Sequence, residues 1–124
     1  MTEFDSTRVS DTVSAALAGP AGIAAVVNVF RAVPGVVHTP GRRGMFRSAP
    51  ERVQIGDWRY EVAADGRLKA AHVVNDIVIA EDLLDAGIVG PHLARALSQL
   101  VARHGPTICP HIDAAVDVLA MNLG

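Results

Sequence analysis

Cys109 is the residue whose position best suits nucleophilic chemistry, because it directly precedes Pro110 at the expected start of the last helix. Free N–H groups and the helix dipole stabilise a thiolate at such a position. His111 lies two residues further on and could accept the thiol proton. Cys109 and His111 are therefore the candidate residues of an enzyme. A buried structural thiol is the favoured alternative, since free cysteine is among the most buried residue types and the chain has no Cys-x-x-Cys motif.

Arginine provides the second candidate, in and just after a loop of thirteen residues, 38–50, that is rich in Gly and Pro. Its members are Arg42, Arg43, Arg47 and Arg52. Guanidinium groups bind phosphate or carboxylate with two hydrogen bonds, and glycines let a backbone approach an anion. The segment is thus a candidate site for a small anionic ligand or for single-stranded nucleic acid. A net charge of −2 argues against nucleic acid, and favours a loop that is solvated or paired with the acidic C-terminal half.

The spacing of ligand residues argues against a metal site. Zinc ligands cluster at short fixed spacings, but this chain has no His-x-x-x-His motif among its five histidines. Gly-rich nucleotide-binding motifs and Gly-x-Ser-x-Gly are absent as well. We therefore expect no metal and no cofactor.

Four acids follow one another closely after the central apolar runs: Asp76, Glu81, Asp82 and Asp85. Two carboxylates can divide the roles of general acid and general base. Acids are also common in solvated turns and in the first turn of a helix, where the dipole favours negative charge. We prefer this second interpretation, with a helical turn over 81–85.

The elements that must hold these residues are clearest in the middle of the chain. Apolar runs are broken there by Gly56-Asp57, Ala64-Asp65-Gly66 and Asn75-Asp76, and these residue types tolerate the positive φ of tight turns. The pattern predicts an antiparallel meander with strands near 52–55, 58–63, 67–74 and 77–80. The last of these is apolar on both faces, which indicates a central or covered strand.

Helices are expected on both sides of the meander. Two short ones, joined at Gly19-Pro20, precede it. After it, Pro91 is expected at the first position of a helix that buries Leu97 and ends at Gly105. A final helix is expected to begin near Pro110.

These elements predict one α+β domain over residues 1–124. It has a three- or four-stranded antiparallel β-meander packed by two N-terminal and two C-terminal helices. Trp58 and Tyr60 are expected on a partly exposed sheet face or at an edge, which leaves a surface for self-association. We therefore expect a homodimer.

Composition restricts where the protein works. The single cysteine excludes an internal disulfide and fits a reducing compartment. The acidic start is unlike a signal peptide, and the most apolar stretch is too short to span a bilayer. We expect a cytoplasmic protein without a membrane partner.

Three runs, 56–60, 72–80 and 90–97, resemble a family of small uncharacterised proteins from mycobacteria and related actinobacteria. The family has no assigned activity, so the resemblance implies no catalytic residue or ligand. The function is therefore unknown, and a small non-enzymatic binding or interaction protein is the preferred hypothesis. The alternatives are an enzyme that uses Cys109 and His111, and an anion or nucleic-acid binder that uses the segment from Arg42 to Arg52.

Overall fold

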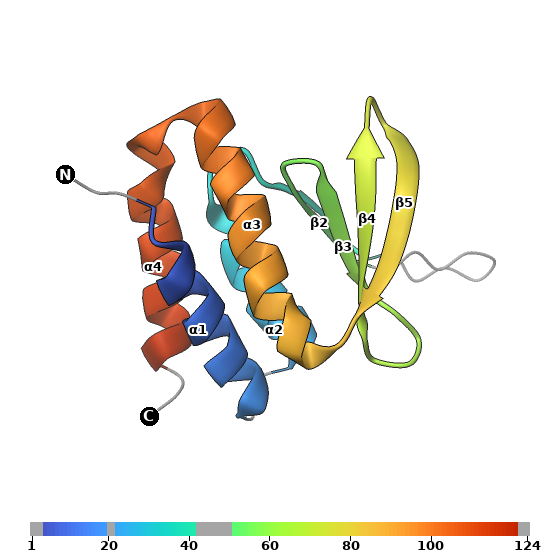
Figure 1. Ribbon diagram of the computed structural model, residues 1–124, viewed down its shortest axis with the longest axis horizontal. Coiled ribbons are helices and arrows are strands. Elements are labelled where there is room, and N and C mark those ends of the chain that lie inside the picture. Colours follow the sequence, from blue (N-terminus) through green and yellow to red (C-terminus); the bar gives the residue numbers. More distant parts are fainter. Residues whose placement is uncertain (1–3, 20–21, 42–50, 122–124) are drawn as a thin grey trace.

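The computed structural model of this chain describes residues 4–19, 22–41 and 51–121, which form helices and one antiparallel sheet (Figure 1). The helices are α1 (Ser6–Ala18), α2 (Ile23–Asn28), α3 (Ala86–His104) and α4 (Cys109–Met121), with the 3₁₀ turns η1 (Val29–Ala32) and η2 (Pro106–Ile108). The strands are β1 (Val37–Thr39), β2 (Arg52–Ile55), β3 (Trp58–Val62), β4 (Leu68–Val74) and β5 (Ile77–Leu84). The α+β class predicted from the sequence is confirmed.

The strands form a meander in the order β1-β2-β3-β4-β5, and each is antiparallel to its neighbour. The predicted turn residues make the connections. Gly56 has a φ of 61° between β2 and β3, and Gly66 has a φ of 88° between β3 and β4. Asn75 and Asp76, with φ of 52° and 64°, form the two-residue turn between β4 and β5. Two successive left-handed residues are what a type I′ hairpin turn requires.

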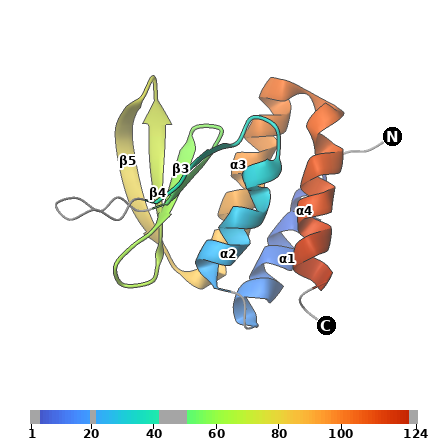
Figure 2. The same cartoon turned by 180° about the vertical axis from the view of Figure 1, so that it is seen from behind.

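All four helices lie on one side of the sheet (Figures 1 and 2). α2 and α3 pack on the strands, and α1 and α4 form a second layer behind them. Side chains of the sheet (Val53, Ile55, Tyr60) and of α3 (Leu93, Leu97) are at most 2% exposed. The burial of Leu97 confirms the helical phase predicted for this segment.

A glycine sets the distance between the two helical layers. A Cβ at Gly90 of α3 would lie 2.5 Å from the Ser10 carbonyl oxygen and 2.5 Å from Ser14 Oγ, both on α1. Only a residue without a side chain allows this approach, which buries Val9 and Val13 of α1 against α3.

The sheet has five strands, so the prediction of three or four was too low. The extra strand, β1, lies at the start of the segment that was expected to be an aperiodic loop. It pairs with β2, with Val37 opposite Gln54 and Thr39 opposite Arg52. Three residues are too few for alternation to show in the sequence.

Both predictions about β5 were wrong. The strand does not stop at residue 80 but continues through Glu81 and Asp82, because Leu84 pairs with Leu68 and both side chains are buried. There is consequently no helical turn over 81–85. β5 is also an edge strand rather than a central one, although Ile77–Ile79 is apolar on both faces.

The start of α3 and the environment of Tyr60 also differ from the predictions. α3 begins at Ala86, so Pro91 lies inside the helix and not at its first position. A first turn forms before the proline, where Ile88 N–H donates to the Asp85 carbonyl at 2.9 Å. Tyr60 is 1% exposed because the helices cover its face of the sheet, whereas Trp58 is only half-buried.

Candidate functional site

β5 forms one edge of the sheet, and no other strand of the described residues pairs with its outer side. This strand has eight residues, and seven of them are exposed. Apolar side chains are among them, with Ile77 at 64%, Ile79 at 59% and Leu83 at 45% exposure. Natural edge strands are usually short or carry Lys or Pro, which discourages pairing with another chain. β5 has neither residue, but it carries two charged residues, Glu81 and Asp82, and a bulge opposite the step from His72 to Val73, which are also devices that limit pairing at edge strands.

Alternate residues of β5 point their backbone N–H and C=O groups outward, to the side where a further strand could pair. Val73 N–H donates to the Asp57 carbonyl at 2.7 Å, on the side away from β5. Two residues that lie opposite each other in an antiparallel pair point their N–H and C=O groups either both toward each other or both away. Val78 lies opposite Val73, which points away from β5, so the N–H and C=O of Val78 point outward. The same alternation leaves the groups of Glu81 and Leu83 outward, because they lie opposite Ala71 and Lys69. In the described part of the chain, no strand pairs with this side of β5.

The edge is acidic as well as apolar. Residues 76–85 contain Asp76, Glu81, Asp82 and Asp85 and no Lys or Arg. By register, Asp82 lies on the helix-covered face of the sheet and Glu81 on the opposite face. Lys69, which lies opposite Leu83, forms an ion pair with Glu61 at 2.7 Å.

Four rings join β3, β4 and α3 behind this edge. Trp58 stacks on His72 with ring centroids 4.7 Å apart, and it meets His92 edge-on at 4.5 Å. The Tyr60 hydroxyl lies 2.8 Å from His92 Nδ1. This cluster was not predicted from the sequence, although the alternation that puts Trp58, Tyr60 and His72 on one face is visible there.

Burial determines the protonation of the Tyr60 and His92 side chains. It raises the pKa of Tyr60 far above its ordinary value, so the hydroxyl stays protonated beside His92 Nδ1. Burial also lowers the pKa of His92, helped by the charge of Arg95 and opposed by Asp82. The imidazole is therefore neutral at pH 7. The contact between Tyr60 and His92 connects β3 to α3, and the stacking of Trp58 on His72 connects β3 to β4.

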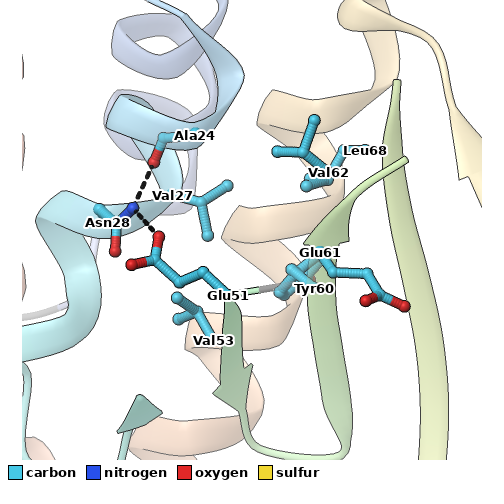
Figure 3. A pocket seen from close by; sticks show the side chains of 9 residues that line it. All are labelled: Ala24, Val27, Asn28, Glu51, Val53, Tyr60, Glu61, Val62 and Leu68. Atoms are coloured by element: carbon cyan, nitrogen blue, oxygen red, sulfur yellow. Dashed lines mark hydrogen bonds between the residues drawn. The ribbon is translucent and has the colours of Figure 1, made fainter. Parts of the chain in front are cut away.

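A small pocket lies between α2 and the sheet (Figure 3). Its volume is about 140 Å³, close to the cavity size that takes up one benzene molecule. Buried Val27, Val53, Tyr60 and Leu68 supply the apolar lining. The side chain of Glu61 points away from it (Figure 3).

The Glu51 carboxylate, which lies beside this pocket, already has hydrogen-bond partners. Asn28 Nδ2 donates to Glu51 and also to the Ala24 carbonyl, at 2.9 Å (Figure 3). His38 Nε2 lies 3.0 Å from the other Glu51 oxygen. These two hydrogen bonds lower the pKa of Glu51. The network ties α2 to β1 and to the start of β2, so its main effect is structural.

The thiol of Cys109, the candidate nucleophile, is buried in the structure. Cys109 is the first residue of α4 and is 1% exposed, whereas His111 is exposed on the same helix. Among the described residues, no hydrogen bond joins the two. A buried thiol fits the structural alternative.

The arginine candidates are only partly placed. Arg42, Arg43 and Arg47 lie outside the described residues. Arg52 lies on β2, and its Nε is 3.6 Å from Glu61, so it belongs to the ion-pair group that includes Lys69. Within residues 4–19, 22–41 and 51–121 there is no group of three or more His, Cys, Asp or Glu that could hold a metal ion.

Comparison with known proteins identifies the family but no activity. Residues 1–121 match a family described as a domain of unknown function (DUF5073). This chain belongs to that family. The expected membership of an uncharacterised family is thereby confirmed, while its actinobacterial range stays a prediction. No curated protein and no solved structure matches the chain.

Membership of the DUF5073 family transfers no ligand or catalytic residue, so the function has to be inferred from the geometry. Within the described residues, no helix combines the length and apolar character needed to cross a membrane.

Proposed function

We propose that this DUF5073 protein is a non-enzymatic interaction protein of the cytoplasm that binds an extended segment of a partner protein along β5. The observation that carries the proposal is the free edge itself, eight residues long with seven of them exposed. Strand addition of this kind uses main-chain hydrogen bonds for affinity and alternate side chains for specificity. The outward N–H and C=O groups of Val78, Glu81 and Leu83 can form these main-chain hydrogen bonds.

The apolar side chains support the same proposal. Ile77, Ile79 and Leu83 would lose contact with water if a neighbouring strand covered them. Burial of apolar surface contributes about 25 cal/mol per Å², so these aliphatic side chains supply binding energy, Ile77 on the helix-covered face and Leu83 on the opposite face. Isolated exposed apolar residues need no explanation, but a row of them along unpaired backbone marks an interaction surface.

The enzyme alternative has less support. Cys109 is buried in the helical layer, and the neutral His92 is held by Tyr60. The single buried thiol also agrees with a reducing compartment such as the cytoplasm.

A peptide-display selection tests the proposal without assuming the partner's sequence. Random ten-residue peptides are selected on the wild-type protein, and the enriched peptides are then titrated against two variants. Leu83→Pro removes an outward N–H from β5, whereas the matched control Leu83→Thr keeps that N–H and removes only the apolar side chain. We expect Leu83→Pro to abolish binding and Leu83→Thr to weaken it.

Circular dichroism on both variants checks that each is folded. The absence of enriched peptides, or peptides that bind wild type and Leu83→Pro equally, would refute binding at the β5 edge.

A further inference from the structure

We infer that the partner segment is basic, with two consecutive Lys or Arg residues flanked by aliphatic ones. This inference rests on the proposed function and names the chemistry of the strand that β5 accepts. It follows from the distribution of charge along β5, because strand addition through main-chain hydrogen bonds alone would require no particular charge.

The acids of β5 lie on both faces of the edge. Glu81 and Asp82 are neighbours in an extended strand, so their carboxylates project to opposite faces. A strand paired with β5 places one residue opposite each of them, again on opposite faces. Two consecutive basic residues in the partner would therefore meet one carboxylate each, with the pairs separated by the backbone.

Among the described residues, nearby cations already have carboxylate partners, although Lys69 also lies close enough to Glu81 for their charges to interact. Lys69 is engaged by Glu61 at 2.7 Å, and Arg103 by Asp57 at 2.7 Å. Asp76 and Asp85, at the two ends of β5, add to the negative charge. Opposite charge is thus the property that a partner must supply opposite Glu81 and Asp82.

The flanking positions require aliphatic residues. Leu83 follows the acids, and Val78 and Ile79 precede them. Between these groups lies Ala80, whose small side chain leaves room on the helix-covered face for a long Lys or Arg stem. The stem would pass over Ala80 while its charged group reached Asp82.

The same charges disfavour a second copy of this chain. If two β5 strands paired antiparallel about Glu81, whose N–H and C=O point outward, Glu81 of each copy would lie opposite Glu81 of the other, and Asp82 opposite Ala80. Glu81 and Asp82 of both copies would then occupy three consecutive positions at the centre of the interface. Like charges so close together are unfavourable in a sheet. A homodimer through β5 would have to use a shifted register with fewer hydrogen bonds.

Two designed peptides test the inference: SVTVRRVTVS and its acidic counterpart SVTVEEVTVS. Each is labelled with a fluorophore and titrated with the full-length protein at low salt, with polarisation as the readout. We expect the Arg peptide to bind at least about tenfold more tightly, because like-charge contacts at an interface are strongly unfavourable. The double variant Glu81→Lys, Asp82→Lys should reverse this preference, and Lys is well tolerated on edge strands.

Hydrogen exchange locates the bound peptide. The amides of Val78, Glu81 and Leu83 should exchange more slowly when the Arg peptide is bound, since these are the outward N–H groups. Protection elsewhere, without protection here, would overturn the inference.

The outcomes separate this inference from the proposed function. Equal binding of both peptides, lost in Leu83→Pro, would show strand addition without charge selection and would refute only the basic partner. If neither peptide binds and sedimentation shows a dimer that Leu83→Pro dissociates, a second copy occupies the edge and the inference is wrong. If neither peptide binds to a monomer, the inference is again wrong, and the display selection decides independently whether β5 binds any segment.

Discussion

The change Gly90→Ala should destabilise this protein, although alanine normally stabilises a helix. An interior helical glycine costs about 1 kcal/mol relative to alanine, so propensity alone predicts a gain. The new Cβ, however, would lie 2.5 Å from both the Ser10 carbonyl oxygen and Ser14 Oγ. Ser14 can rotate its hydroxyl away, but the carbonyl oxygen belongs to the backbone of α1 and cannot.

The magnitude follows from how far the helices must separate. Ordinary contacts of a Cβ begin near 3.4 Å, so α1 and α3 would have to move apart by about 1 Å. This movement loosens the packing of Val9, Val13 and Leu93, which are all at most 2% exposed. Overpacking of this kind typically costs about 1–3 kcal/mol, which exceeds the gain in propensity.

The matched control is Gly87→Ala on the same helix. Gly87 is exposed, and a Cβ there has no atom within 4 Å. This variant should be as stable as wild type or more stable, by up to about 1 kcal/mol. Urea unfolding followed by circular dichroism measures both variants, with an unchanged m-value as the check that only stability differs. If Gly90→Ala were as stable as Gly87→Ala, the close contact between α1 and α3 would be wrong.

Three further predictions concern the core, the thiol and the histidine cluster. Leu97→Ala should lower the unfolding free energy by about 2–5 kcal/mol, because Leu97 is fully buried; a loss under about 1 kcal/mol in a chemical melt would contradict the packing of α3. Cys109, at 1% exposure, should react slowly with a thiol reagent at pH 7 in the native state, and fast labelling that His111→Ala abolishes would favour the enzyme hypothesis instead. His92 has a folded-state pKa below its ordinary value, so the unfolded chain takes up the proton first and stability should fall as the pH is lowered through about 6.5. His92→Gln should flatten this part of the curve of unfolding free energy against pH, and an unchanged slope would remove His92 as its cause.

Local chemistry made part of the fold predictable. Asn75, Asp76 and Gly56 were predicted in turns because few other residues adopt a positive φ, and all three do so. The helical phase of Leu97 followed from spacing alone. These features depend on neighbours in the sequence, which a single chain displays directly.

Features that depend on distant neighbours were missed. Ile77–Ile79 has the composition of a central strand, and nothing local shows that no strand follows on its outer side. Pro91 is typical of a helix start, but the preceding residues form a further turn because Ile88 bonds to Asp85. The hydrogen bond from Tyr60 to His92 joins residues 32 positions apart, so it required the tertiary structure.

The two edges of the sheet are very unequal, and this limits the size of any assembly. β1, at the far edge, has three residues, whereas β5 has eight. A sheet with two long free edges can join head to tail into an open-ended filament. β1 is too short to form a long ladder with β5 of a second chain, so this sheet cannot extend from chain to chain in that way. Complexes formed at β5 should therefore not grow into filaments through β1 as the concentration rises.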